Sequence, residues 1–382
     1  MKIKKGNGFM MILLKNATLY DPAYRGKKDV LICFDRILAI GEGLEPCFPD
    51  TEVIDATGKL LIPGLIDQHV HFIGGGGEQG PSSRTPELLF SDVVQAGVTT
   101  LVGVLGTDCV TRSLEALLAK TKALNEEGVT AYCLTSAYCY PPLTVTGSVM
   151  RDIVLLSEVI GCKLALSDHR GSHPTREEII RLASDVRMAG LVGNKPGVLH
   201  IHIGADPAGI EPILDIVRST DLPAWNFRPT HMTRHPKQAA EFTQMGGYAD
   251  FTAGDALPSV LKEYRAELDL THVTVSSDAN GSKPKWDAAH ENVIGMGVGK
   301  MTSLLETLRG FVNEGFALED ALPLFTENVA KALRLYPRKG TVQEGADADL
   351  VLLEEDYSVH SVFAKGRKLM QDGKILVRGM YE

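Results

Sequence analysis

From residue 61 to about residue 340, short apolar segments alternate with amphipathic segments of helical spacing. Apolar or β-branched runs predict buried strands, and apolar positions repeating with the period of a helix predict the helices that cover them. Eight strands are expected, at 61–71, 99–106, 130–138, 163–168, 198–204, 224–232, 248–253 and 272–278. Helices are expected at 86–95, 113–125, 176–189, 209–219, 236–244, 259–268, 302–313 and 318–333. This alternation predicts a (β/α)8 TIM barrel.

The two ends of the chain have a different pattern, with short strand-like runs between turn residues. The N-terminal runs lie at 12–14, 30–34, 37–40 and 52–54, and the C-terminal runs at 350–353, 358–364 and 375–377. Neither end has a long helical pattern between its strands. We therefore expect both ends to form one small β-sandwich domain, residues 1–60 and 341–382, beside a barrel at 61–340.

Composition excludes several classes of function. With 382 residues, 44% of them apolar, the chain can bury a large core. A net charge of -9 and no clustered Lys or Arg argue against binding to nucleic acid. No apolar segment reaches the roughly 20 residues that span a membrane. Six cysteines without CxxC pairing, and a basic start without a cleavage site, favour reduced thiols and a cytoplasmic location. Met1, Met10 and Met11 are all possible starts.

Two histidines close the first predicted strand. Its last residues are Asp67-Gln68-His69-Val70-His71, and Gly74 to Gly77 and Glu78 follow. Side chains alternate faces along a strand, so His69 and His71 point the same way and can bind one cation. The glycine-rich loop indicates a barrel mouth rather than a solvated surface. Ordinary core or surface histidines can also show this spacing, so the rest of the chain has to decide.

Further charged or metal-binding residues fall on other predicted strands. Barrel enzymes carry their chemistry at the carboxyl ends of the strands. Lys163 lies in the fourth strand, His202 in the fifth, and His231 and Asp278 end the sixth and the eighth. Each has a structural explanation when taken alone; Asp278, for example, could start a turn. Their coincidence favours one site, because four imidazoles and a carboxylate can bind two divalent cations.

Lys163 is the candidate bridge between two such cations. It lies in the apolar run Cys162 to Leu166, where an unpaired ammonium would be unfavourable. An ammonium has no lone pair to donate, whereas a lysine carbamate presents two anionic oxygens, one for each metal. The alternative is an ordinary lysine whose amine reaches solvent from a strand end.

Six segments carry a resemblance to the amidohydrolase superfamily of binuclear metal enzymes. They are PGLIDQHVHFIGGGGEQGP (63–81), SAYCYPP (136–142), KLALSDHRGSHPT (163–175), HIHIGAD (200–206), RPTHMTRHP (228–236) and SSDANGSKP (276–284). The His-X-His strand alone is typical of the superfamily. The strings GGGGE, SDHR and THMTR narrow the resemblance, over nearly the whole chain, to isoaspartyl (β-aspartyl) dipeptidases.

The resemblance implies six protein ligands for two zinc ions per chain: His69, His71 and Asp278 for one, His202 and His231 for the other, and carboxylated Lys163 with a hydroxide as bridges. His200 shares a strand face with His202, but His202 occupies the motif position because Ile203-Gly204 follows it. Zinc lowers the pKa of bound water, so hydroxide would be available at neutral pH.

The resemblance also assigns catalytic and substrate-binding roles. Asp278 would act as general base and then general acid, and Tyr138 would donate to the oxyanion. Eight further residues would bind an isoaspartyl dipeptide: Glu78, Thr107, Arg170, Arg234, Ser282, Gly75, Gly76 and Gly77. Glu78 matches the position that binds the ammonium, and the two arginines match the carboxylate grips. The expected partners are this small-molecule substrate and, in a homo-oligomer, further copies of the chain.

Three alternatives stay open. Glu78 and Arg170 could form an ordinary surface ion pair. A cyclic-amide amidohydrolase, such as a hydantoinase or dihydropyrimidinase, would share the metals but has no evident need for Glu78 and two arginines. A non-catalytic scaffold with the same fold should lack metal ligands, whereas all six positions are filled here.

Overall fold

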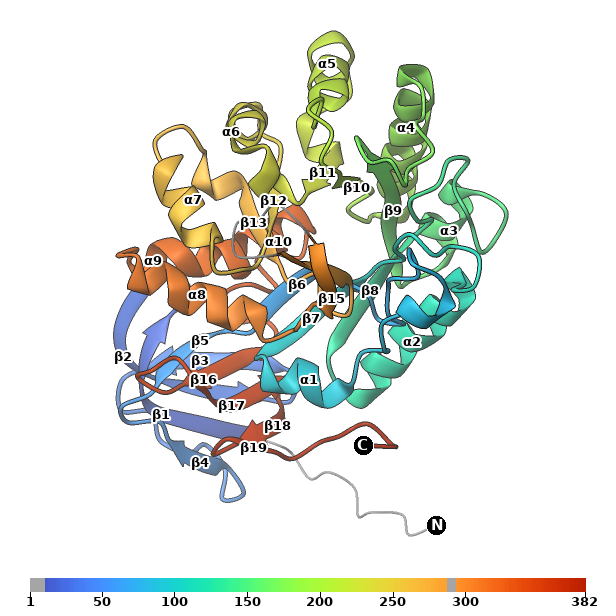
Figure 1. Cartoon of the computed structure of the whole chain (residues 1–382). Coiled ribbons are helices and arrows are strands. Elements are labelled where there is room, and N and C mark those ends of the chain that lie inside the picture. Colours follow the sequence, from blue (N-terminus) through green and yellow to red (C-terminus); the bar gives the residue numbers. More distant parts are fainter. Residues whose placement is uncertain (1–10, 287–292) are drawn as a thin grey trace.

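Eight parallel strands surround the centre of the molecule (Figure 1). The structure, a computed structural model, describes residues 11–286 and 293–382; the possible starts Met1 and Met10 lie outside it. The strands are β6 (Leu65–Val70), β7 (Val98–Gly103), β8 (Thr130–Thr135), β9 (Val159–Leu166), β10 (Val198–Ile203), β11 (Phe227–Thr230), β12 (Ala249–Thr252) and β13 (Val273–Ser276). Each overlaps one of the eight predicted strands.

The eight strands form a ring. Strands β11 to β6 make a six-stranded sheet in the order β11-β10-β9-β8-β7-β6, and β12 pairs with β13. The ring closes because β12 contacts β11, and β13 contacts β6; a parallel bridge also joins Val70 to Ala279. The predicted (β/α)8 barrel is therefore confirmed.

Helices surround the barrel (Figure 1). They are α1 (Phe90–Gln95), α2 (Leu114–Glu127), α3 (Val149–Leu155), α4 (Arg176–Gly193), α5 (Glu211–Ser219), α6 (Pro236–Gln244), α7 (Leu257–Glu263), α8 (Ser303–Asn313), α9 (Leu318–Ala321) and α10 (Glu327–Ala332). The longest, α4, begins with a capping box between Thr175 and Glu178 and buries Ile179, Leu182 and Val186, as its apolar spacing predicts. The pattern did not predict α3.

Two predicted elements are each divided in the structure. The strand expected at 61–71 is two strands, β5 (Leu60–Pro63) and β6, separated at Gly64. A Cβ on Gly64 would lie 2.2 Å from Thr99 Oγ1, so the backbone approaches the next strand closely here. The helix expected at 318–333 is wrong as one element: the 3-10 helix Leu322–Phe325 separates α9 from α10, because Pro323 lacks the N–H that a continuous helix needs.

Both ends of the chain build one β-rich domain, as predicted (Figure 1). Its strands are β1 (Met11–Tyr20), β2 (Tyr24–Cys33), β3 (Arg36–Gly41), β4 (Glu52–Asp55), β5, β16 (Leu350–Leu353), β17 (Val359–Ala364), β18 (Arg367–Gln371) and β19 (Lys374–Ile375). The sheet order is β19-β18-β17-β16-β5-β1-β2-β3, with β4 on β1. Because β5 belongs to this sheet, the sheet continues to Pro63; the boundaries at 60 and 340 stay predictions.

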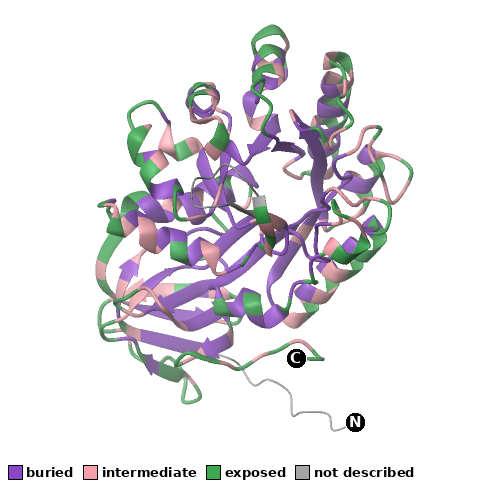
Figure 2. Ribbon diagram, in the orientation of Figure 1, coloured by how far each residue is buried: buried purple, intermediate pink, exposed green. Residues whose placement is uncertain are grey.

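The core follows the strands of both parts. Figure 2 shows buried residues along the barrel strands and the terminal sheet, and exposed residues on the outer helices. An antiparallel pair of strands, β14 (Ser282–Trp286) with β15 (Val293–Val298), follows β13 and was not predicted. Across 11–286 and 293–382, no helix has the length and apolar character that crossing a bilayer requires.

Candidate active site

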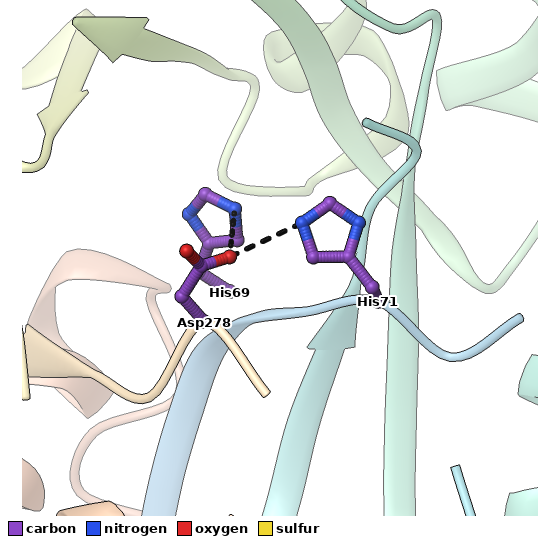
Figure 3. Close-up of side chains that lie close together, drawn as sticks. All are labelled: His69, His71 and Asp278. Atoms are coloured by element: carbon purple, nitrogen blue, oxygen red, sulfur yellow. Dashed lines mark ion pairs between the residues drawn. The ribbon is translucent and has the colours of Figure 1, made fainter. Parts of the chain in front are cut away.

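His69, His71 and Asp278 converge at one end of the barrel. His69 is the second-last residue of β6, and His71 directly follows that strand. Asp278 lies two residues after the end of β13. Figure 3 shows the three side chains facing one another, with Asp278 Oδ1 3.2 Å from His71 Nε2 and 3.5 Å from His69 Nε2. Asp278 has a φ of 56°, an unusual conformation for an aspartate at a strand end that turns its side chain into the group. The three donors all lie within 4.8 Å of one another.

The other three predicted ligands lie against this group. His202 is near the carboxyl end of β10, and His231 directly follows β11 with a φ of 68°. The His231 ring centre lies 4.6 Å from that of His202 and 5.2 Å from that of His69. Lys163, in β9, places Nζ 3.4 Å from His69 Nε2. Six residues from five strands or strand ends are thus brought together.

The outer ring nitrogens of three histidines each have a protein partner. His202 Nε2 lies 2.8 Å from Asp168 Oδ2, His231 Nδ1 lies 2.6 Å from Thr252 Oγ1, and His69 Nδ1 lies 3.2 Å from His200 Nε2. A partner on one ring nitrogen fixes the orientation of the ring and leaves the other nitrogen available as a metal ligand. This is the usual arrangement of histidines around a protein-bound metal. The donor chemistry of this group therefore fits divalent metal ions.

Burial controls the charge of these side chains. Desolvation lowers the pKa of His69 and His231 well below the ordinary value, and lowers that of His202 to about 4 despite its hydrogen bond with Asp168. At neutral pH the rings are uncharged and have a lone pair for a metal. Burial alone would raise the pKa of Asp278, but the hydrogen bond from His71 and the neighbouring His231 hold it below its usual range.

Lys163 is buried without an acidic partner. Its side chain is 0% exposed, and no carboxylate among the described residues lies within ion-pair distance of Nζ. Desolvation lowers the pKa of Lys163 to about 7, against the attraction of Asp278 and Asp250. Much of the amine is therefore unprotonated at neutral pH, and an unprotonated amine is the nucleophile that carboxylation by CO2 requires.

A second, more exposed group surrounds Glu78 in the loop after β6. Glu78 Oε1 accepts hydrogen bonds from Thr107 Oγ1 at 3.1 Å, Ser282 Oγ at 3.1 Å and Arg170 Nη1 at 3.2 Å. Arg234, in the 3-10 helix Met232–Arg234, donates from Nη1 to the Ile203 carbonyl at 3.0 Å. The structure therefore joins four of the predicted substrate residues directly, and Arg234 lines the same cavity.

Tyr138 connects the two groups. Its hydroxyl lies 2.5 Å from His202 Nδ1, and the Arg170 guanidinium stands 5.6 Å from the centre of its ring. Asp168 accepts from His202 Nε2, which leaves the Nδ1 lone pair as the acceptor for the tyrosine hydroxyl. Burial raises the pKa of Tyr138 well above its ordinary value, so the hydroxyl keeps its proton and remains a donor.

One cavity of about 920 Å³ includes both groups. Among its lining residues are His71, Gly76, Glu78, Thr107, Tyr138, Arg170, His202, His231, Arg234, Asp278 and Ser282. His202 lines the cavity, whereas His200 does not; His69 and Lys163 also lie behind the cavity lining. Gly75 and Gly77 do not line it either: the Gly75 N–H donates to the Asn280 carbonyl and the Gly77 N–H to the Ser83 carbonyl.

Comparisons with known proteins agree with this geometry. A sequence model of the "Amidohydrolase family" matches residues 253–369. A crystal structure of β-aspartyl dipeptidase from Fervidobacterium islandicum AW-1, in complex with β-Asp-Leu dipeptide, is 43% identical, covers 96% of this chain and 98% of that chain, and superposes with a TM-score of 0.90. The chain belongs to the β-aspartyl dipeptidases, a family of hydrolases in the amidohydrolase superfamily.

More distant relatives are similar in fold or in sequence. Dihydropyrimidinase from Brevibacillus agri is 18% identical over 97% of both chains, with a TM-score of 0.69. Adenine deaminase 4 from Rhizobium meliloti is 24% identical over 92% of this chain, and the alignment spans 55% of that deaminase. The chain thus spans about half the length of this curated relative. Superfamily members use a binuclear metal centre, which agrees with the His69, His71 and Asp278 group.

Several residues of this β-aspartyl dipeptidase site were not predicted from the sequence. Buried Asp250, in β12, accepts hydrogen bonds from Gln68 Nε2 at 2.7 Å, Thr230 Oγ1 at 2.7 Å and Ser276 Oγ at 2.6 Å. It therefore ties together β6, β11 and β13, the strands that lead to His69, His231 and Asp278. A lone acid in an apolar strand was the available signal, since a buried carboxylate requires partners.

Two glycines around His71 were also missed. A Cβ on Gly106 would lie 2.9 Å from His71 Cε1, and a Cβ on Gly281 would lie 2.9 Å from His71 Cδ2 and 2.6 Å from Asp278 Oδ1. Any side chain at either position would displace the imidazole. Neither contact has a local signal, because His71, Gly106 and Gly281 come from three separate strand ends.

Proposed function

We propose that the protein is a binuclear zinc peptidase that hydrolyses the isopeptide bond of β-aspartyl dipeptides. The observation that carries the proposal is the cavity shared by the histidine and Asp278 group and by Glu78, Arg170 and Arg234. A β-aspartyl dipeptide has one α-ammonium and two free carboxylates around its amide. One acid and two arginines beside a metal-binding group match those charges.

The ligand set provides for two metal ions. His69, His71 and Asp278 would hold one, His202 and His231 the other, and carboxylated Lys163 would supply the anion shared between them. Zinc held by these residues would supply Lewis-acid chemistry: a lowered pKa for the attacking water and polarisation of the scissile carbonyl. The low pKa values of the buried histidines and of Lys163 support this assignment, because metal ligands must be unprotonated.

The side chains of the protein would bind and orient the substrate and would transfer protons. Glu78 would hold the α-ammonium, and Arg170 and Arg234 would each hold a carboxylate. Asp278 would take a proton from the attacking water and deliver it to the departing amine nitrogen, so that water and dipeptide give aspartate and the second amino acid. The His202 Nδ1 lone pair serves one partner at a time, so a metal there would leave the Tyr138 hydroxyl free to donate to the developing oxyanion.

The direct test compares two isomers. Zinc-loaded protein, expressed with zinc and bicarbonate, should hydrolyse β-Asp-Leu at least about 10²-fold faster than α-Asp-Leu, because the α isomer places its carboxylate and amide in exchanged positions. Ninhydrin or chromatographic detection of free leucine measures both rates. Equal turnover of the isomers, or none of the β isomer, contradicts the proposal.

Arg234→Met separates this proposal from a cyclic-amide hydrolase. Loss of a charge-assisted contact to a substrate carboxylate should raise KM for β-Asp-Leu by about 10-fold to 100-fold. The matched control is Arg218→Met, because Arg218 forms an exposed ion pair with Glu211 on α5 and should leave KM unchanged. Hydrolysis of hydantoin or dihydrouracil by the wild type, together with an unchanged KM for the dipeptide in Arg234→Met, would favour the cyclic-amide enzyme.

Two further expectations accompany the proposal. We place the enzyme in the cytoplasm, in agreement with six free cysteines among the described residues, and as a homo-oligomer. Light scattering coupled to size-exclusion chromatography measures the oligomeric state. A mass equal to that of one chain would contradict the expected homo-oligomer.

A further inference from the structure

Asp168 has no role in the proposed reaction, yet its carboxylate contacts both functional groups. It lies two residues after β9, and its side chain is 4% exposed. Oδ1 accepts from Arg170 Nε at 2.9 Å and from the Arg170 backbone N–H at 2.8 Å. Oδ2 accepts from Arg170 Nη2 at 2.7 Å and from His202 Nε2 at 2.8 Å. One buried carboxylate thus fixes a predicted substrate arginine and a predicted metal ligand.

The shared oxygen Oδ2 is the important contact. Arg170 Nη2 and His202 Nε2 lie only 3.3 Å apart. Because the carboxylate only accepts, both nitrogens carry protons that point at Oδ2. Without that acceptor, two N–H donors would face each other with nothing between them, and the side chains would move apart. Asp168 therefore determines the positions of both groups at once.

Each of the two positions has a consequence elsewhere in the cavity. With Nε2 held by Asp168, the His202 ring directs Nδ1 to the Tyr138 hydroxyl, and the ring as a whole packs against that of His231. With its Nε and Nη2 held by Asp168, Arg170 extends Nη1 toward Glu78 at 3.2 Å. A rotation of the Asp168 carboxylate would disturb the lone pair offered to a metal and the guanidinium offered to the substrate.

We propose that Asp168 is a positioning residue that couples the metal centre to the substrate carboxylate grip. The inference rests on the proposed function, since it takes His202 as a zinc ligand and Arg170 as a carboxylate-binding residue. The alternative is that Asp168 serves only as an ion-pair partner of Arg170. The two differ in one respect: only the coupling role predicts that loss of Asp168 speeds zinc release while loss of Arg170 does not.

The experiment uses zinc-loaded full-length protein in four forms: wild type, Asp168→Asn, Arg170→Met and Asp206→Asn. The last is the matched control, because exposed Asp206 lies in the loop after β10 and its carboxylate accepts from the neighbouring Ala208 N–H at 2.8 Å. Zinc release to a chromogenic chelator, the visible spectrum of the cobalt-substituted proteins, and KM and kcat for β-Asp-Leu are measured for each.

Asp168→Asn should release zinc about 10-fold to 100-fold faster than the wild type, with an altered cobalt spectrum, and should raise KM about 10-fold. Arg170→Met should raise KM but release zinc at the wild-type rate, because the Asp168 to His202 bond remains. Asp206→Asn should match the wild type throughout. Zinc release from Asp168→Asn at the rate of Asp206→Asn overturns the inference, as does equally fast release from Arg170→Met.

Two further outcomes also test the inference: a variant that does not fold, and a wild type without the proposed function. If Asp168→Asn does not fold, Asp168→Glu is measured in the same way; it keeps the charge but moves the oxygens, and wild-type zinc release and KM in that variant overturn the inference. A wild-type protein that binds fewer than two zinc ions, or that leaves β-Asp-Leu intact, rejects the proposed function and the inference with it. A wild type that passes both tests, with an unaffected Asp168 variant, rejects the inference alone.

Discussion

Two buried lysines, one in the barrel and one near the terminal sheet, have opposite surroundings. Lys163 is 0% exposed and Lys339 is 2% exposed. Lys339 Nζ forms an ion pair with Asp347 at 2.9 Å and a shorter one with Asp349. Lys163 has only the 3.4 Å contact with His69 Nε2, and no acid of the described chain pairs with it.

The difference appears in the charge that each lysine carries. Burial alone lowers a lysine pKa, but Asp349 and Asp347 raise the pKa of Lys339, so it stays an ammonium. Nothing comparable offsets the burial of Lys163, whose pKa is lowered to about 7. A structural lysine is buried with its counter-ions, whereas an unpaired buried lysine is a candidate for chemistry. Three substituted proteins test this comparison.

The largest effect is expected for Lys163→Met. Loss of the residue that would bridge the metals should lower kcat for β-Asp-Leu by about 10³-fold and reduce bound zinc below two ions per chain. The metal-free variant should be as stable as the metal-free wild type or more stable, because an unpaired amine is replaced by an apolar side chain. Metal analysis and chemical denaturation measure the two quantities. A large loss of stability without metal would make Lys163 structural.

Lys339→Met should have the reverse profile. Removing one partner of a buried ion cluster leaves Asp347 and Asp349 undercompensated and should lower the free energy of unfolding by about 3–5 kcal/mol. KM for β-Asp-Leu should not change, since the cluster is not part of the cavity lining. The matched control is Lys262→Met, because Lys262 pairs with Glu314 on the surface and should change stability by less than about 0.5 kcal/mol. Equal stability of the two variants contradicts the prediction.

A smaller effect is expected in the pH dependence of stability. The pKa of Lys339 is raised by folding, so its contribution is full below the unfolded value of about 10.4 and is lost as pH rises through the folded value. Burial would raise the pKa of Asp347, but Lys339 lowers it, so that contribution is present above about pH 3.9 and is lost as pH falls. The stability difference between the wild type and Lys339→Met should therefore be largest between these limits. Denaturation series at several pH values measure it, and a difference independent of pH would remove the ion cluster as its cause.

The eight barrel strands and most helices could be predicted because each carries its own periodic signal. The errors have both distant and local causes. Gly64 divides the first predicted strand because Thr99 lies against it, whereas Pro323 divides the predicted helix from within. Strand β18 was also missed; it pairs with β17, which directly precedes it in the chain. Strand β15, which pairs with β14, contains Gly295 and Gly297 and therefore has little strand signal.

The candidate site, like the fold, could be predicted in part from the sequence. Residues with distinctive chemistry at strand ends, such as His69, His231 and Asp278, were found, and the structure brings them together. Their ligand roles stay predictions. Residues that act through a contact were missed: Asp168 is one acid among many in the sequence, and Asp250 is one polar residue in an apolar strand. Their importance lies in which donors surround them, and the sequence order does not contain that information.

The sequence by itself determined the barrel, the β-rich domain and the residues with metal-binding chemistry, because alternation of strand and helix and the identity of a side chain are local properties. Tertiary structure alone decided which ring nitrogen each histidine turns inward, that His202 and not His200 faces the cavity, and that Lys163 is buried without a counter-ion while Lys339 has two. These features depend on distances between residues from different strands. Such distances exist only once the barrel has closed.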